Sequence, residues 1–145
     1  MYEELIQQLK VVQATAFSFY LKSHNFHWNV TGSDFAQYHE FLKDVYEAVF
    51  ASVDDYAEKV RSLDAFAPGS LSRFSELTKI EDELNIPTTL AMIGRLNVDN
   101  DILINELYRV DELCDSLNQR GIQNFIQGQI EYHEKLRWML KSFLK

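Results

Sequence analysis

The scarcity of chain-breaking residues constrains the fold of this sequence most. Only two prolines and five glycines occur among 145 residues, which favours long uninterrupted helices over a β fold built from many turns. Between these breaks, apolar residues recur every three or four positions, the spacing of one buried helix face. From Glu3 to Val30 this apolar stripe consists of Leu5, Leu9, Val12, Ala16 and Phe19.

Two amphipathic segments fill the first half of the chain. The first covers residues 3–30 and stops before Gly32, since glycine favours the backbone conformation found just beyond a helix. The second covers residues 35–63, and Ser33 or Asp34 is the candidate for capping its first turn. Two long helices joined by a tight turn are therefore predicted here.

The second half contains two more such segments, which a longer connection separates from the first pair. Pro87 suits the first turn of a third helix, because its missing N–H has no partner there in any case. A fourth helix starts near Ile122, after a turn at residues 118–121. Within the connection, a short helix over residues 71–77 is expected, with Ser70 as its cap. The sequence thus predicts an all-α four-helix bundle with a short helix between the second and third long helices.

Composition excludes several other classes of protein. Hydrophobic residues make up 46% of the chain, which is enough for a core within a single domain over residues 1–145 and excludes a disordered chain. No apolar run approaches the roughly 18 residues of a membrane span, and the start MYEELIQQLK lacks the apolar stretch of a signal peptide. Cys114 is the only cysteine, so the cytoplasm is the expected compartment. The formal net charge of −8 favours metal cations over polyanions such as DNA.

Three of the four histidines fall within HNFHWNVTGSDFAQYH, residues 24–39. His27 lies five residues before the turn glycine and His39 lies seven after it, so the two come side by side if the helices form a hairpin. Imidazole nitrogen is a ligand suited to iron, zinc and copper. His27 and His39 are therefore candidate metal ligands, whereas His24 and His133 are interpreted as structural.

Carboxylates usually complete a site that oxidises ferrous iron, and Asp54 with Glu58 is the best pair, at i, i+4 on one helix face. Fifteen residues separate His39 from Asp54, which is roughly 22 Å along a helix. One ion cannot contact both within one chain. Either the two features are unrelated, or two chains meet antiparallel and each site takes histidines from one and carboxylates from the other. The chain has no Glu-x-x-His, the motif of di-iron sites inside a single bundle.

A set of short motifs is spread over nearly the whole chain. The motifs are His27-Trp28-Asn29-Val30-x-Gly32, Phe35, His39-Glu40, Asp54-x-x-x-Glu58-Lys59 and His133-Glu134-Lys135-x-x-Trp138-Met139-Leu140. Together they resemble the Dps family, the miniferritins of the ferritin-like superfamily. The resemblance implies a ferritin-like bundle and a hollow shell of twelve subunits. It also implies that Fe(II) is oxidised between two-fold related subunits, with hydrogen peroxide as the preferred oxidant, and is stored as ferric mineral.

The resemblance also implies a role for individual side chains. In it, His27 and His39 are iron ligands from one subunit, and Asp54 and Glu58 are ligands from its two-fold neighbour. Carboxylates that face the cavity, where mineral nucleates, are Glu40, Asp44 and Glu47.

Two features depart from the family pattern. In the family, an aspartate usually follows the second histidine by four residues, whereas here that position holds Lys43. A protonated lysine ammonium is no iron ligand. It is able instead to pair with Asp54 or Glu58 of the neighbouring subunit. A weakened ferroxidase site is therefore predicted, with a structural shell that has an impaired site as the alternative. A DNA-compacting role is disfavoured, because no lysine-rich tail precedes the first helix and Lys10 is the only basic residue before Lys22.

Overall fold

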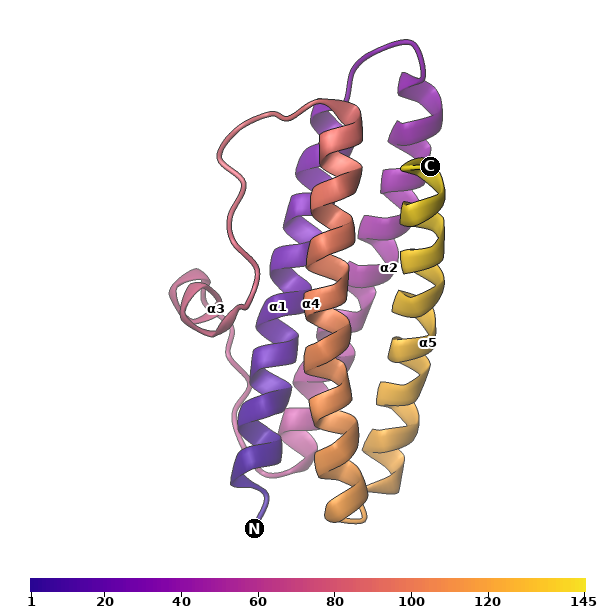
Figure 1. Cartoon of the computed structure of the whole chain (residues 1–145). Coiled ribbons are helices and arrows are strands. Elements are labelled where there is room, and N and C mark those ends of the chain that lie inside the picture. The colour runs from indigo at the N-terminus through magenta and orange to yellow at the C-terminus, as the bar shows by residue number, and fades with distance from the viewer.

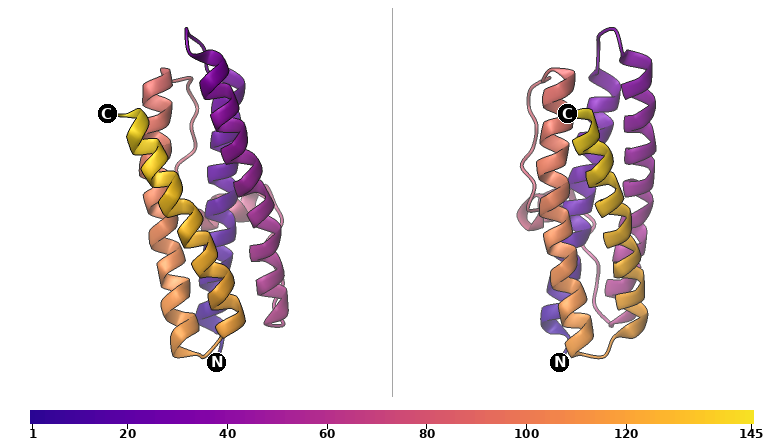
Figure 2. Two further views of the ribbon diagram at one scale, coloured as in Figure 1. Left: turned by 90° about the vertical axis from the view of Figure 1, so that its right-hand side faces the viewer. Right: turned by 45° about the vertical axis from the view of Figure 1, so that its right-hand side comes forward.

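Five helices and no strand make up the regular structure of the chain, seen in a computed structural model that describes residues 1–145 (Figure 1). The short helix α3 (Leu71–Leu77) lies beside α1, outside the bundle (Figures 1 and 2). The predicted all-α four-helix bundle with its short connecting helix is confirmed. No helix combines the length and the apolar character needed to cross a membrane. The four long helices are α1 (Glu3–Asn29), α2 (Phe35–Ser62), α4 (Thr89–Ser116) and α5 (Arg120–Phe143).

The apolar faces of the four long helices meet in one core. Its largest side chains have no exposed surface and come from every long helix, among them Phe19 and Phe26 of α1, Tyr56 of α2, Leu103 of α4 and Ile126 of α5. Complete burial of such a side chain stabilises the fold by about 2 kcal/mol. The core therefore sets how the helices are rotated about their axes, and with it the direction of every polar side chain described below.

The predicted helix caps are only partly correct. Ser70 begins α3 as predicted, because its hydroxyl accepts a hydrogen bond from the Arg73 N–H at 3.3 Å. For α4 the prediction is wrong in detail, since Thr88 is the cap and accepts from the Ala91 N–H at 3.3 Å. Pro87 lies just outside this helix. A threonine hydroxyl satisfies an orphan N–H, whereas a proline only removes one, so the threonine marks the true start.

The α1–α2 turn joins the first two helices into a hairpin. Gly32 has a φ of +117°, a backbone conformation that residues with a side chain rarely adopt. Neither Ser33 nor Asp34 caps α2 through its side chain, so that expectation is wrong. Instead the Phe35 N–H donates to the Gly32 carbonyl at 3.1 Å. The main chain holds this turn.

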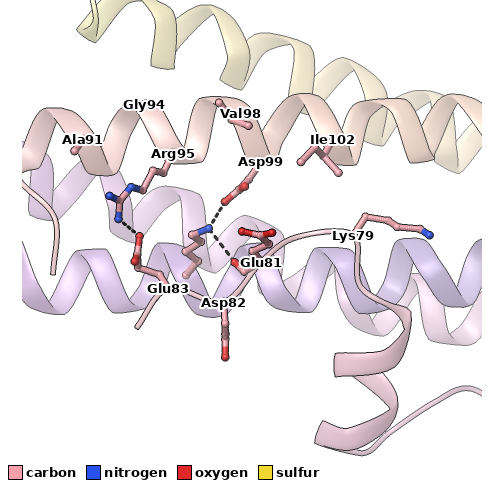
Figure 3. Close-up of a pocket in the computed structure, with 11 residues that line it drawn as sticks. Lys79, Glu81, Asp82, Glu83, Ala91, Gly94, Arg95, Val98, Asp99 and Ile102 are labelled. Carbon is pink, nitrogen blue, oxygen red and sulfur yellow. Dashed lines mark hydrogen bonds and ion pairs between the residues drawn. The ribbon is translucent and has the colours of Figure 1, made fainter. Parts of the chain in front are cut away.

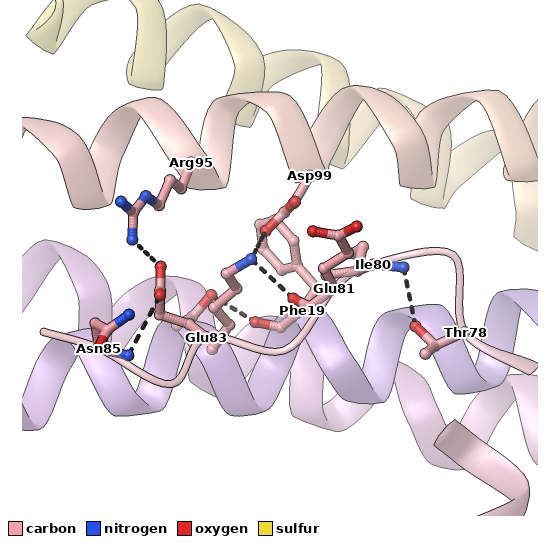
Figure 4. Close-up of polar contacts among 10 residues, drawn as sticks. Phe19, Thr78, Ile80, Glu81, Glu83, Asn85, Arg95 and Asp99 are labelled. Atoms are coloured by element: carbon pink, nitrogen blue, oxygen red, sulfur yellow. Dashed lines mark hydrogen bonds and ion pairs between the residues drawn. The ribbon is translucent and has the colours of Figure 1, made fainter. Parts of the chain in front are cut away.

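The segment between α3 and α4 runs along α1 and α4, and we call residues 78–88 the strap. Lys22 of α1 donates at 3.0 Å to the carbonyl of Glu81, a strap residue labelled in Figure 4. The same ammonium lies 2.8 Å from a carboxylate oxygen of Asp99 on α4, and both side chains are buried. One lysine thus ties the strap to two helices of the bundle.

A second ion pair joins the strap to α4. Arg95 donates to the carboxylate of Glu83, and the Glu83 side chain is only 11% exposed. From the sequence, the acidic run Glu81-Asp82-Glu83 is interpreted as a solvated linker. That interpretation is wrong for Glu83, because its side chain is largely buried where it pairs with Arg95 of α4.

Candidate metal centre

His27 and His39 lie against each other beside the α1–α2 turn. Their rings are stacked, with centroids 3.7 Å apart and planes inclined by 16°. The Nδ1 of His27 donates to the His39 carbonyl at 2.7 Å, and the Nδ1 of His39 donates to the His27 carbonyl at 2.8 Å. The structure therefore brings together the two histidines that the hairpin spacing pairs.

This exchange of hydrogen bonds determines which ring nitrogen is available to a metal. A carbonyl oxygen only accepts, so each Nδ1 carries the proton of the neutral ring and each Nε2 keeps its lone pair. Metal-binding histidines are commonly held in this way, with one nitrogen on a carbonyl and the other on the ion. His27 is buried and His39 is half-buried. The hairpin thus orients two imidazoles as a pair of nitrogen ligands.

His24 belongs to an adjoining aromatic cluster. Its ring stacks on Tyr46 of α2, with centroids 3.8 Å apart, and its Nδ1 lies 2.9 Å from the Tyr20 hydroxyl. The Trp28 ring lies 3.9 Å from it on α1. Burial, together with the neighbouring His27, lowers the pKa of His24. These contacts agree with the structural interpretation of His24.

Tyr20 and Tyr46 are absent from the residues predicted for the site, although a signal for them exists. Tyr20 precedes His24 by four residues, and Tyr46 follows His39 by seven. Both spacings put a tyrosine on the same helix face as a histidine. The ring contacts themselves follow only from how α1 packs on α2.

Asp54 and Glu58 lie one turn apart on the exposed face of α2. A hydrogen bond between protonated Glu58 and Asp54, and then the repulsion between the two charges, raise the pKa of Glu58. Neither carboxylate forms an ion pair within the chain. A cation placed between them would relieve the repulsion, so the pair is a second candidate set of ligands.

The histidine pair and the carboxylate pair are separate within one chain. Because α2 is one uninterrupted helix, His39 and Asp54 are about 22 Å apart along its axis. No group of three or more His, Cys, Asp or Glu side chains is placed to hold a metal ion. Within one chain, therefore, the two candidate half-sites, the histidine pair and the carboxylate pair, cannot contact the same ion.

The remaining predicted residues also lie on α2. Glu40, Asp44 and Glu47 are exposed and follow one another at i, i+4 and i+7, so they form a single acidic stripe. Lys43 lies one turn after His39, is half-buried and makes no ion pair within the chain. The structure thus puts a cation without an ion-pair partner in its own chain one turn from His39 on α2.

Charged residues also gather in an open pocket of about 750 Å³ between the strap, α1 and α4 (Figure 3). Burial raises the pKa of Asp99, while the Lys22 ammonium opposes this shift. Lys22 is paired with Asp99, and Figure 3 shows Arg95 directed at Glu83. Because Lys22 and Arg95 already neutralise Asp99 and Glu83, we interpret this pocket as a structural contact between the strap and the bundle and not as a metal centre.

Comparison with known families and curated proteins gives consistent matches. The family model described as "Ferritin-like domain" matches residues 6–145. The chain is 31% identical over 134 residues to the uncharacterized low temperature-induced protein all0458 of Nostoc sp. strain PCC 7120, covering 91% of this chain and 75% of that protein. It is 28% identical to the DNA protection during starvation protein of Helicobacter pylori strain J99, covering 94% and 95%.

Solved structures have the same backbone over nearly the whole chain. Dps from Thermosynechococcus elongatus superposes with a TM-score of 0.96 at 25% identity, covering 99% of this chain and 91% of that one. A Dps protein from Bacillus brevis superposes with a TM-score of 0.95 at 26% identity, covering 99% and 96%. The similarity therefore includes the α1–α2 hairpin and the connection between α2 and α4.

Proposed function

Because the chain belongs to the ferritin-like family and, within it, to the Dps miniferritins, we propose that it oxidises Fe(II) between two-fold related copies and stores the ferric product inside a shell of twelve subunits. The observation that carries this proposal is the stacked pair of His27 and His39. Each imidazole gives its Nδ1 to a carbonyl and keeps its Nε2 for an ion.

In the proposed site, His27 and His39 of one copy act with Asp54 and Glu58 of the neighbour. Two neutral imidazoles and two carboxylates form a mixed nitrogen and oxygen donor set, which suits iron. The net charge of −2 on these four side chains attracts Fe(II) and neutralises its charge of +2. The half-site separation of about 22 Å on α2 supports the inter-subunit arrangement, since neither half is complete alone.

Hydrogen peroxide is the proposed oxidant. Two Fe(II) ions each give up one electron, and the peroxide takes up these two electrons and two protons to become two water molecules. This stoichiometry removes free Fe(II) and peroxide together, so the reaction protects a cell from oxidative damage. The single cysteine supports a cytoplasmic location for this chemistry.

Glu40, Asp44 and Glu47 are proposed as the place where ferric mineral begins to form. Their exposed carboxylates lie along one stripe of α2, and none of them belongs to either half-site. Three carboxylates in a row attract ferric ions without enclosing them. Such a surface suits nucleation of a solid better than tight binding of one ion.

A structural shell with an impaired site is the second candidate, and Lys43 is the observation that favours it. DNA compaction is the third and is disfavoured by the net charge of −8. Anaerobic Fe(II) binding followed by addition of peroxide separates the first two. The structural shell predicts no binding above that of His27→Ala and no oxidation above that of buffer.

The experiment that tests the proposal measures the mass of the oligomer and its affinity for Fe(II). A shell of twelve copies has a mass of about 200 kDa, twelve times the 17.0 kDa chain, and light scattering measures this directly. We expect His27→Ala and His39→Ala each to lower Fe(II) affinity at least ~10-fold, as loss of one ligand does. A monomeric wild-type chain, or binding that survives both substitutions, contradicts the proposal.

A further inference from the structure

Lys43 is a half-buried cation without a partner in its own chain. Glu40 and Glu47 are three and four residues away on α2, yet neither lies within ion-pair distance of it. The buried Lys22, by contrast, is paired with a carboxylate at 2.8 Å. Removing an ammonium from water without a counter-charge is costly. Lys43 is therefore suited to a carboxylate supplied from outside the chain.

Asp54 and Glu58 offer the complementary charge. They are exposed, lie one turn apart on α2 and form no ion pair within the chain. Lys43 cannot reach them in its own chain, because eleven residues of α2 separate it from Asp54, about 16 Å along the axis. Only the carboxylates of another copy can come within contact distance.

The positions of these residues along α2 match a two-fold arrangement. His39 and Glu58 have their midpoint between residues 48 and 49, and Lys43 and Asp54 share that midpoint. All four side chains leave the helix within about 100° of one another, at 100° per residue. A two-fold axis at this midpoint that brings His39 beside the partner's Glu58 therefore also brings Lys43 beside the partner's Asp54.

We propose that Lys43 of one copy forms an ion pair with Asp54 of its two-fold neighbour, and that this pair limits each inter-subunit site to one tightly held Fe(II). The proposal rests on the proposed function and deepens it. Of the four proposed ligands, the histidine pair and the neighbour's Glu58 then hold the ion, while Asp54 is engaged by Lys43. The ammonium occupies the space and supplies the charge that a second cation would otherwise bring, so Lys43 determines the stoichiometry of the site.

Three variants test this role. Lys43→Gln removes the charge and keeps much of the length, and Lys43→Asp replaces the cation with a ligand. Lys59→Gln is the matched control, because Lys59 follows Glu58 directly but places its ammonium 5.2 Å from the centre of the Phe125 ring. Circular dichroism measures whether each variant is folded, and light scattering measures how far it is assembled under the conditions of the titration.

The measurement is calorimetric titration with Fe(II) under anaerobic conditions and, separately, with Zn(II), which cannot be oxidised. We expect one tight ion per chain for the wild type and for Lys59→Gln. Lys43→Gln binds about tenfold more tightly, because a neighbouring positive charge of this strength has been removed. Lys43→Asp takes up a second ion per chain. Two ions per wild-type chain, or titrations of both Lys43 variants that match the wild type, overturn the inference.

Assembly without metal provides an independent readout. If Lys43 and Asp54 pair across the axis, Lys43→Gln weakens association of the metal-free protein and Lys59→Gln does not. Loss of assembly confined to the Lys43 variant therefore supports the ion pair.

His27→Ala separates this inference from the function on which it rests. If that substitution abolishes binding while the Lys43 variants behave as wild type, only the role of Lys43 fails. If it leaves binding intact, the proposed site itself is wrong.

Discussion

Asn100 of α4 and His133 of α5 form a reciprocal pair inside the bundle. The Asn100 Nδ2 donates to the His133 carbonyl at 2.8 Å, and the His133 Nδ1 donates to the Asn100 Oδ1 at 2.7 Å. The other ring nitrogen, Nε2, is buried without a partner. Its surroundings are aromatic, with Phe19 meeting the ring edge to face at a centroid distance of 6.0 Å. These surroundings therefore favour the neutral form of the His133 imidazole.

The fold is accordingly expected to lose stability in acid through His133. Burial lowers the pKa of His133 to about 3 in the folded chain, against about 6.5 when unfolded. Between these values the unfolded chain binds a proton that the folded chain does not. The free energy of unfolding therefore falls as the pH drops from about 6.5 to about 3, by up to about 5 kcal/mol. Above pH 6.5 this group has no effect.

Chemical denaturation at a series of pH values checks this expectation. The double variant Asn100→Leu with His133→Leu removes both polar partners together, so that neither is left unsatisfied. Its stability should depend less on pH between about 3 and 6.5 than that of the wild type. An unchanged pH dependence would show that His133 is not the group responsible.

Breaking the buried ion pair under the strap should destabilise the fold. Lys22→Met leaves the Asp99 carboxylate buried without its counter-charge, and we expect a loss of about 3 kcal/mol. The double variant Lys22→Met with Asp99→Leu should recover most of this loss. Lys79→Gln is the control, since Lys79 lines the same pocket but forms no ion pair. A double variant as unstable as Lys22→Met argues against the ion pair as the cause.

The carboxylate pair should contribute to Fe(II) binding beyond its general negative charge. Glu58→Gln is expected to weaken anaerobic Fe(II) binding about tenfold or more, because it removes a proposed ligand. Asp54→Asn is expected to weaken it similarly, because it leaves the Lys43 ammonium of the other copy unpaired beside the ion. Asp55→Asn removes the same charge from the adjacent position, about 100° further around the helix, and should have little effect. Equal losses in all three variants would indicate electrostatic attraction without coordination.

The turn that carries the histidine pair should be sensitive to one methyl group. Gly32→Ala introduces a side chain at a φ of +117°, and the cost is about 1–2 kcal/mol. No atom lies within 4 Å of the added carbon, so this cost is conformational and not steric. Thermal unfolding measures it. Gly69→Ala, also in open space but without a positive φ, should change stability by less than about 0.5 kcal/mol.

Much of the fold could be predicted because helix formation leaves a local signal. The apolar stripes gave the extent of α1 and α2, and Ser70 marked the start of α3 through a contact three residues away. The start of α4 was misplaced because Pro87 and Thr88 are adjacent and both suit a helix start. Spacing from the turn also paired His27 with His39, since a hairpin brings equidistant residues together.

The sequence by itself determined the lengths and order of the helices, the hairpin that pairs two histidines, and the separation of His39 from Asp54 that keeps one ion from contacting both within one chain. These properties are distances along one chain, and the helical repeat converts them directly into positions. Only the tertiary structure decided that Lys22 meets Asp99, that Asn100 meets His133, and that the paired imidazoles exchange hydrogen bonds with main-chain carbonyls. Those contacts depend on how each helix is rotated against its neighbours, which the whole packed core sets at once.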